Sequence, residues 1–156
     1  MGVDNVATKI DQSPEDICYN CRGFCCQLGG IVATKEEVEA IQDQGYPNHF
    51  TQLSDDVFGT TWRENGVCRY FTENKCSIYS LRPLGCRMFP VVQTMSGDII
   101  VIECPLASQL PEDELMTRKK ILLQRPISIF RSSLKLRIEH YKKLRLRSSK
   151  YENHIL

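Results

Sequence analysis

The stretch Cys18-Tyr-Asn-Cys21-Arg-Gly-Phe-Cys25-Cys26 carries four thiols within nine residues. Four further thiols follow singly along the chain, at Cys68, Cys76, Cys86 and Cys104. Cysteines spaced so closely indicate a soft metal, a disulfide framework or a reactive dithiol. We favour the metal, and this choice decides the fold, because ligation would order the cysteine-rich head onto the rest of the domain.

The composition favours a reducing compartment for these thiols. The chain has 156 residues, of which 8 are cysteine, about 5%, and this is below the density of a small secreted disulfide scaffold. Residues 1–17 are polar and acidic without a secretory pattern, and no apolar run is long enough to span a bilayer. We therefore expect a cytoplasmic protein, in which a cysteine cluster binds metal or performs catalysis.

The first clear helix signal is the sequence Thr34-Lys-Glu-Glu37, which predicts a capping box. The helix should run to about Gln44 and stop at Gly45, with Val38 and Ile41 facing the core.

The neighbouring segments have less regular patterns. Glycines predict loop for the cysteine-rich head, and the lack of a clear period predicts mostly loop for residues 46–66. Residues 67–71 indicate a strand that turns at residues 73–75, and residues 77–80 indicate one short helical turn.

The second half predicts a β-hairpin followed by two helices. The hairpin strands are residues 91–95 and 99–102, with Gly97 supplying the positive φ of the turn. The helices should cover residues 111–124 and about 127–147. One stripe of the last helix should face the core: Ile127, Phe130, Leu134, Ile138 and Tyr141.

These elements together predict an α+β fold. We expect a small cysteine-rich metal-binding domain over residues 1–110, with a short antiparallel hairpin. A helical C-terminal extension over residues 111–156 should pack on this domain or project from it.

The chemistry of the thiols favours metal binding but leaves their pairing open. Thiolates select zinc, copper(I) and iron–sulfur clusters, and Cys18-x2-Cys21 resembles one half of a zinc site. A second close pair is missing, which favours a site gathered from several elements. Eight thiols could form two four-coordinate sites, or one cluster plus a reserve. A redox dithiol would need a βαβ context that the head lacks, and one or two cysteines could simply be buried.

Histidines are too few and too scattered in the sequence to be the main metal ligands. Of the three, His49, His140 and His154, only His49 is retained as a reserve ligand.

A second signature follows the head, Cys76-Ser-Ile-Tyr79-Ser-Leu-Arg82-Pro83-Leu-Gly-Cys86-Arg87-Met-Phe89-Pro90. Tyr79 and Phe89 could wall a cysteine site, and Arg82 and Arg87 could balance thiolate charge. The two prolines, Pro83 and Pro90, should stiffen a loop that presents Cys86.

The two signatures together resemble the YkgJ-like cysteine-cluster family, a family of zinc- or iron-chelating CxxCxxCC domains, over about residues 18–105. The resemblance implies a cysteine-ligated centre of iron–sulfur or zinc type. Its ligands would be Cys18, Cys21, Cys25, Cys26, Cys76 and Cys86 by motif, and Cys68 and Cys104 by position. The family also includes longer flagellin lysine N-methylases, whereas this chain has no glycine-rich cofactor loop after a strand.

Charge is distributed unevenly along the chain, although its net value is +1. Residues 1–117 hold 8 basic and 17 acidic side chains, and residues 118–156 hold 12 basic and 2 acidic ones. The basic last helix could contact nucleic acid, an acidic protein or an anionic membrane surface, or it could be a solvated helix covering the acidic body.

The leading hypothesis is a cytoplasmic metal-binding protein that holds an iron–sulfur cluster, or else zinc, through its cysteines. Iron–sulfur is favoured because the ligands are numerous and irregularly spaced. One alternative is a metal-dependent protein-modifying enzyme of the lysine N-methylase type. Another is a metal-bearing regulator whose basic C-terminal helix binds nucleic acid or protein.

Overall fold

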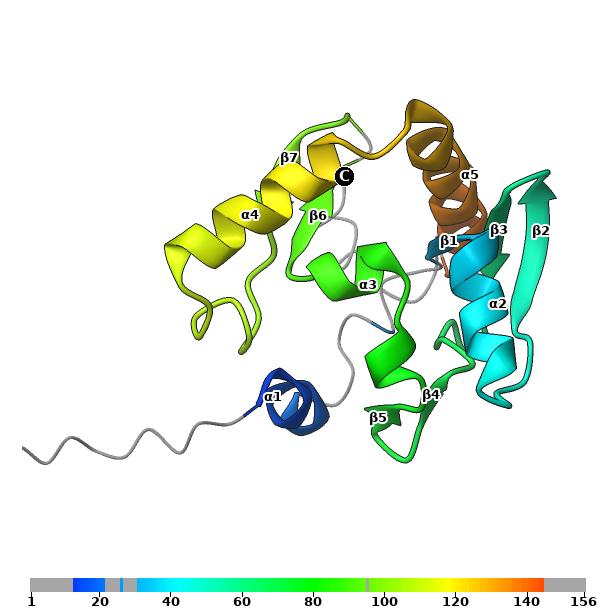
Figure 1. The fold of residues 1–156 in the computed structure, drawn as a ribbon, viewed down its shortest axis with the longest axis horizontal. Helices are drawn as coiled ribbons and strands as arrows, with labels where there is room; N and C mark the ends of the chain where they lie inside the picture. The colour runs from blue at the N-terminus through cyan, green and yellow to red at the C-terminus, as the bar shows by residue number, and fades with distance from the viewer. Residues whose placement is uncertain (1–12, 22–25, 27–30, 95, 145–156) are drawn as a thin grey trace, which may run out of the picture.

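The computed structural model describes residues 13–21, 26, 31–94 and 96–144. Within these residues it combines helices with one three-stranded and two two-stranded antiparallel sheets, and it ends in two helices (Figure 1). The predicted α+β class is therefore confirmed.

The largest sheet has the strand order β1-β3-β2, and both of its pairings are antiparallel. Its strands are β1 (Val32–Thr34), β2 (Phe50–Ser54) and β3 (Val57–Thr60). The prediction of mostly loop for residues 46–66 is wrong at β2 and β3. Only Phe50 of β2 is buried and its other four residues are exposed, so the sequence lacks the alternation that would predict a strand.

Helix α2 (Lys35–Asp43) begins at the predicted capping box, which is confirmed. The Thr34 amide donates to Glu37 Oε2 at 2.9 Å, and the Glu37 amide donates to Thr34 Oγ1 at 3.3 Å. Val38 and Ile41 are buried, as their spacing predicts. This exchange satisfies two amides that a helix N-terminus otherwise leaves unpaired.

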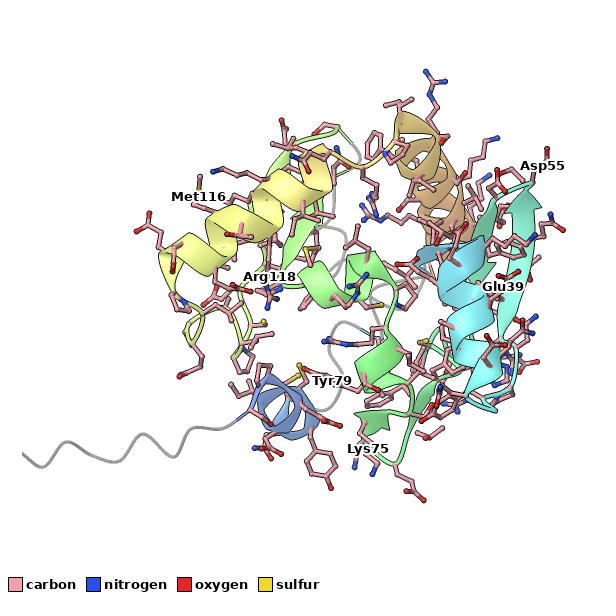
Figure 2. The ribbon with its side chains drawn as sticks, in the orientation of Figure 1. Glu39, Asp55, Lys75, Tyr79, Met116 and Arg118 are labelled. Atoms are coloured by element: carbon pink, nitrogen blue, oxygen red, sulfur yellow. The ribbon has the colours of Figure 1, made fainter. Side chains whose placement is uncertain are left out.

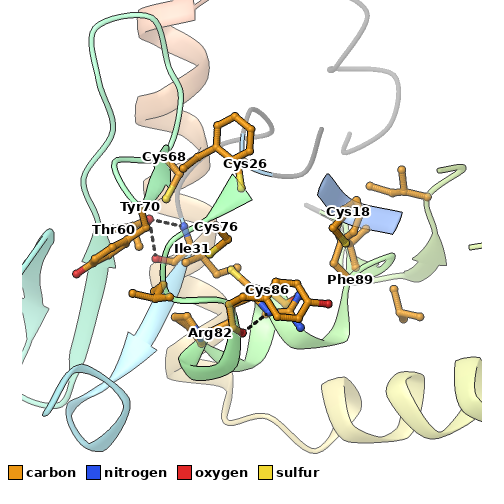
Figure 3. A pocket seen from close by; sticks show the side chains of 18 of the residues that line it. Cys18, Cys26, Ile31, Thr60, Cys68, Tyr70, Cys76, Arg82, Cys86 and Phe89 are labelled. Atoms are coloured by element: carbon orange, nitrogen blue, oxygen red, sulfur yellow. Dashed lines mark hydrogen bonds between the residues drawn. The ribbon is translucent and has the colours of Figure 1, made fainter. Parts of the chain in front are cut away.

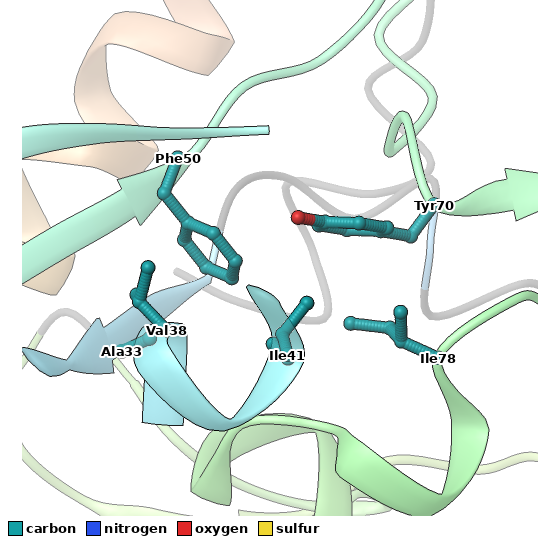
Figure 4. Packing of buried hydrophobic residues seen from close by; sticks show 6 residues of the cluster. All are labelled: Ala33, Val38, Ile41, Phe50, Tyr70 and Ile78. Carbon is teal, nitrogen blue, oxygen red and sulfur yellow. The ribbon is translucent and has the colours of Figure 1, made fainter. Parts of the chain in front are cut away.

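Helices α2 and α5 (Ile127–Leu144) pack on opposite faces of the three-stranded sheet. Ala33 faces α2, in a cluster that Figure 4 shows. Val32, its neighbour in β1, packs with Leu136 of α5, because successive strand residues point to opposite faces. A Cβ at Gly59 would lie 3.2 Å from both Leu136 methyl groups, so glycine permits this close approach. The α2-side cluster contains Ala33, Val38, Ile41, Phe50, Tyr70 and Ile78.

The predicted apolar stripe of the last helix is wrong at two positions. Ile127 and Ile138 are 62% and 40% exposed, whereas Ser133 and Leu136 are buried. The inward face contains a polar serine, so counting apolar residues selected a neighbouring face. The Tyr141 side chain lies outside the described part of the structure.

The predicted hairpin is confirmed as β6 (Val91–Gln93) and β7 (Ile99–Val101), and Gly97 has φ +95°. Helix α4 (Glu112–Leu123) packs against it through Leu122, which joins Met88 and Val91 in a buried cluster. Arg118 extends from α4 toward α3, and its Nη1 donates to the Phe89 carbonyl at 2.7 Å (Figure 2).

The cysteine-bearing segments form short elements between these packed layers. They are α1 (Pro14–Asn20), β4 (Phe71–Thr72), β5 (Lys75–Cys76), η2 (Tyr79–Leu81) and α3 (Leu84–Met88). The predicted turn between β4 and β5 is confirmed, with positive φ at Glu73 and Asn74. The predicted strand at residues 67–71 is mostly absent, since only Phe71 belongs to a strand and Cys68 forms an isolated bridge with Trp62.

Two helices replace predicted loops. Helix α1 forms because the Ser13 hydroxyl accepts from the Asp16 amide and Pro14 suits the first turn. Helix α3 forms between Pro83 and Pro90, so Cys86 lies on one helical turn rather than on a loop. The remainder of the predicted head loop, residues 22–25 and 27–30, lies outside the described residues.

Candidate metal centre

Five cysteines line one cavity of about 120 Å³. They come from segments that are far apart in the sequence, and Figure 3 shows their sulfur atoms around the cavity. These cysteines are Cys18, Cys26, Cys68, Cys76 and Cys86. The site therefore depends on the tertiary fold rather than on one local motif.

Backbone pairing brings three of the five cysteines to the cavity. The Cys68 amide donates to the Cys26 carbonyl at 3.0 Å, which joins the head to the middle of the chain. The Phe71 amide in turn donates to the Cys68 carbonyl at 3.0 Å. Cys76 lies opposite Phe71 in the β4–β5 pairing. A short run of hydrogen bonds thus connects Cys26, Cys68 and Cys76.

Arg82 holds the segment that carries Cys86. Its Nε donates to the Tyr79 carbonyl at 2.8 Å, and its Nη1 donates to the Cys86 carbonyl at 3.4 Å. Its guanidinium lies 3.7 Å from the Tyr79 ring centroid, a cation–π contact. Arg82 therefore brings a positive charge to the wall of the thiol cavity, as the second signature suggests.

Arg87, the other arginine of that signature, has a different role. Its Nη2 lies 3.4 Å from Glu37 Oε1, and Arg87 is absent from the cavity wall. The same Glu37 oxygen accepts from the Leu84 amide at 2.9 Å. Glu37 therefore links the start of α2 to the start of α3, the helix that carries Cys86.

A half-buried tyrosine, Tyr79, and a buried one, Tyr70, lie beside the thiols. Burial raises the pKa of Tyr79, Arg82 opposes this rise, and the adjacent Cys18 adds to it. Burial also raises the pKa of Tyr70. The His49 amide opposes this rise because it donates a hydrogen bond to the Tyr70 hydroxyl, whereas Cys68 and Cys76 add to it. The cavity wall therefore disfavours additional negative charge on these phenols.

Other predicted site residues lie elsewhere. Cys21 and Cys104 are partly buried but do not line the cavity, and the Cys21 thiol donates to the Cys18 carbonyl at 3.2 Å. Cys25 lies outside the described residues. The reserve ligand His49 packs edge-on against Tyr70 with 4.9 Å between ring centroids, away from the cavity wall.

The chemistry of the thiol donors fits a soft metal, whereas the positions of the described side chains do not form a closed ligand shell. Thiolates are the preferred ligands of zinc and iron–sulfur clusters. Among the residues that the structure describes, no three side chains of His, Cys, Asp or Glu are gathered closely enough to hold an ion. The cavity also exceeds the roughly 10–15 Å³ that one water needs, so it has room for a group of several atoms.

Two arginines in the cavity wall were missed by sequence reasoning. Arg125 follows α4, and Arg137 belongs to α5. Both lie outside the two cysteine signatures, and the charge pattern of α5 predicts a basic helix that is solvated or binds a partner. Nothing in the local sequence around Arg125, which directly precedes Pro126, signals its place in the cavity wall.

Comparisons with known proteins give a family but no individual relative. Within the described residues, no helix has the length and apolarity needed to cross a membrane. Neither the curated proteins nor the solved structures include a match to this chain. The model of the CxxCxxCC family, described as "Putative zinc- or iron-chelating domain", matches residues 17–113. This match spans more than half of the chain and both cysteine signatures, and the chain therefore belongs to the CxxCxxCC family.

Proposed function

We propose that this protein holds a metal centre through cysteine thiolates, and that the centre is an iron–sulfur cluster in preference to zinc. The observation that carries the proposal is the meeting of five thiols from separate segments at one cavity. These five are the first candidates for ligands, and Cys21, Cys25 and Cys104 complete the proposed set. A cytoplasmic location belongs to the same proposal, because thiols stay reduced there.

Three features favour a cluster over a single zinc ion. The cavity offers more thiols than the four that a tetrahedral zinc requires. Its volume is larger than one ion needs. Its wall includes the aromatic rings of Tyr70, Tyr79 and Phe89, which would shield a bound cluster on that side. A bound cluster would supply one-electron redox chemistry, whereas zinc in a closed site would supply stability.

The chain's own residues prepare the site for a negatively charged centre. Arg82 places a cation beside the thiols, and its contact with the Tyr79 ring restricts its movement. Phe89 and Tyr70 are buried in the wall. These residues orient the thiol-bearing segments and reduce the local dielectric, which strengthens attraction between a thiolate centre and Arg82.

The direct experiment is metal and acid-labile sulfide analysis of protein purified without oxygen, with a visible absorption spectrum. Iron with sulfide and broad visible absorption would support the cluster. Stoichiometric zinc in colourless protein would support the coarser metal proposal and reject the cluster. Protein with neither metal, even after reconstitution, would reject both.

Substitution of cavity cysteines tests the ligand assignment. Cys76→Ser and Cys86→Ser should each lower metal content by at least half, since each removes a soft donor. Thr72→Ser, an exposed change on the same hairpin as Cys76, is the matched control and should leave metal content unchanged. Unaltered metal content in both cysteine variants would contradict the assignment.

A metal-bearing regulator is a second candidate, favoured by the surface of α5. Arg131, Lys135 and Lys142 are exposed on this helix. If they bind phosphates of nucleic acid, affinity should fall steeply with salt and with their joint replacement by glutamine. Absence of binding at low salt would remove this candidate.

A protein-modifying enzyme of the lysine N-methylase type is the remaining alternative, and it comes from the family resemblance. Binding of S-adenosylmethionine is its simplest requirement. Titration calorimetry with this cofactor tests it, and no detectable binding would remove the methylase analogy.

A further inference from the structure

The thiol-lined cavity has a second, basic region, formed by Arg125 and Arg137. Arg137 is anchored, since its Nη1 donates to the Gln93 carbonyl. Arg125 lies against α3: a Cβ on Gly85 would be 3.8 Å from Arg125 Nη1. Gly85 directly precedes Cys86, so the Arg125 guanidinium lies close to the segment that carries a proposed ligand.

Among the described residues, Arg125 has no hydrogen-bonded or ion-paired partner for its charge. Its Nε is buried, and among the described residues its side chain donates no hydrogen bond and forms no ion pair. A buried donor left in this state costs about 1–3 kcal/mol, and more when it is charged. Burial accordingly lowers the pKa of Arg125, although Glu37 opposes the effect.

The neighbouring acids do not supply that partner. Glu37 Oε1 accepts from the Leu84 amide and lies 3.4 Å from Arg87, while Oε2 accepts from the Thr34 amide. Glu15 is the acidic residue of the cavity wall, and it belongs to α1 and is exposed. The basic region of the cavity therefore presents a positive charge that an external anion could meet.

The cavity wall is also partly aliphatic. It includes Ile31, Val91, Ile102 and Leu122, of which Val91, Ile102 and Leu122 are buried. Cavities that bind small molecules commonly combine such apolar walls with a few polar anchors. An apolar wall suits an organic ligand better than a strongly hydrated inorganic anion.

We propose that this cavity binds a small organic carboxylate, whose anionic group pairs with Arg125 and Arg137 and whose apolar body lies along the aliphatic wall toward the thiols. The planar guanidinium fork matches a carboxylate with two parallel hydrogen bonds. The inference deepens the proposed function, because the ligand would lie beside the metal centre. Binding by the arginines can nevertheless be measured separately from the metal.

Titration calorimetry on the metal-containing full chain tests the ligand class. The probes are acetate, butanoate, hexanoate, the neutral hexanamide and inorganic phosphate. Affinity should rise up to about fourfold per added methylene as apolar surface is buried. Hexanamide should bind at least tenfold more weakly than hexanoate. No carboxylate binding at millimolar concentration, or phosphate binding as tight as that of hexanoate, would overturn the proposal.

Variants test the assignment to Arg125. Arg125→Gln should weaken hexanoate binding at least tenfold with metal content unchanged, whereas Arg131→Gln, an exposed change on α5, should alter neither. Arg125→Lys keeps the charge without the fork and should weaken binding by an intermediate factor, which preserves the test if the glutamine variant does not fold. Unchanged affinity in the Arg125 variants would overturn the assignment.

Metal content, measured in parallel, separates this inference from the proposed function. One outcome is that Arg125→Gln loses its metal and the native protein binds no carboxylate. Arg125 would then only balance the charge of the metal centre, and the inference would be overturned. Carboxylate binding by a chain that never takes up metal would support the inference and reject the metal centre.

Discussion

The sheet region and the cysteine cavity show two ways of holding a chain together. In the sheet region, formed by α2, α5 and β1–β3, the core residues Ile41, Ala33 and Val32 are 0%, 1% and 2% exposed. The five cysteines around the cavity are only partly buried, and β4 and β5 have two residues each. Apolar packing alone accounts for the first region. In the second, Tyr70, Phe89 and Val91 are buried in the cavity wall, but the thiol-bearing segments are short and half-buried, so we infer that a bound centre holds these segments in place.

Metal removal should produce the largest difference in local stability between the two regions. A strong chelator should speed amide hydrogen exchange at least tenfold in residues 68–89 and much less in residues 32–60. Ligation of a structural metal can contribute about 10 kcal/mol or more, and it acts where the thiols are. Mass spectrometry of exchanged peptides measures this. Equal loss of protection in both segments would contradict the division, and re-addition of the metal is the control.

A cavity in the packed core should weaken the sheet region. Ile41→Ala should lower the free energy of unfolding by about 2–5 kcal/mol, because the removed atoms leave a void among buried neighbours. Ile127→Ala, at a 62% exposed position, should change it by about 0.5 kcal/mol or less. Urea denaturation measures both. Similar effects for the two variants would show that burial does not distinguish these positions.

Glu37 connects the two regions, and its loss should have a smaller effect. Glu37→Ala should lower the free energy of unfolding by about 1–3 kcal/mol, because the Thr34 and Leu84 amides lose their acceptor. Its control is Glu39→Ala, which removes an exposed ion pair to Lys35 and should cost about 0.5 kcal/mol or less. Denaturation and metal analysis together would show whether the link also supports the cavity. Equal costs would argue against a linking role.

Protonation of His49 should have the smallest effect on the free energy of unfolding. Burial lowers its pKa below 6.5, and the charges of Arg69 and Arg63 lower it further. The unfolded chain therefore binds this proton more readily, so the stabilising contribution is present above pH 6.5 and is lost as pH falls through the lower folded pKa.

His49→Gln should accordingly reduce the loss of stability between pH 7.5 and pH 5.5 by no more than about 0.5 kcal/mol, since solvent screens the charge. Urea denaturation at the two pH values measures it, with metal content as a control. If the variant instead loses more stability than the native protein between these pH values, the folded state does not lower the pKa of His49.

Local signals were reliable where residues close in sequence determine the structure. The capping box at Thr34 and Glu37 and the turn at Gly97 act within a few residues, and both were predicted correctly. Prediction failed where a distant contact decides. Strand β2 is extended because it pairs with β3, and Ser133 is buried because α5 packs on the sheet. A local sequence pattern shows neither the pairing strand nor the sheet.

The sequence by itself determined the family and the donor chemistry, because thiol type and spacing within a signature are properties of the chain. It could not select Cys18, Cys26, Cys68, Cys76 and Cys86 from eight cysteines as the residues that line one cavity. It also gave no indication that Arg125 would join them in the cavity wall with its Nε buried. Only the tertiary structure decided these points, because residues more than a hundred positions apart meet through the packing of helices and strands.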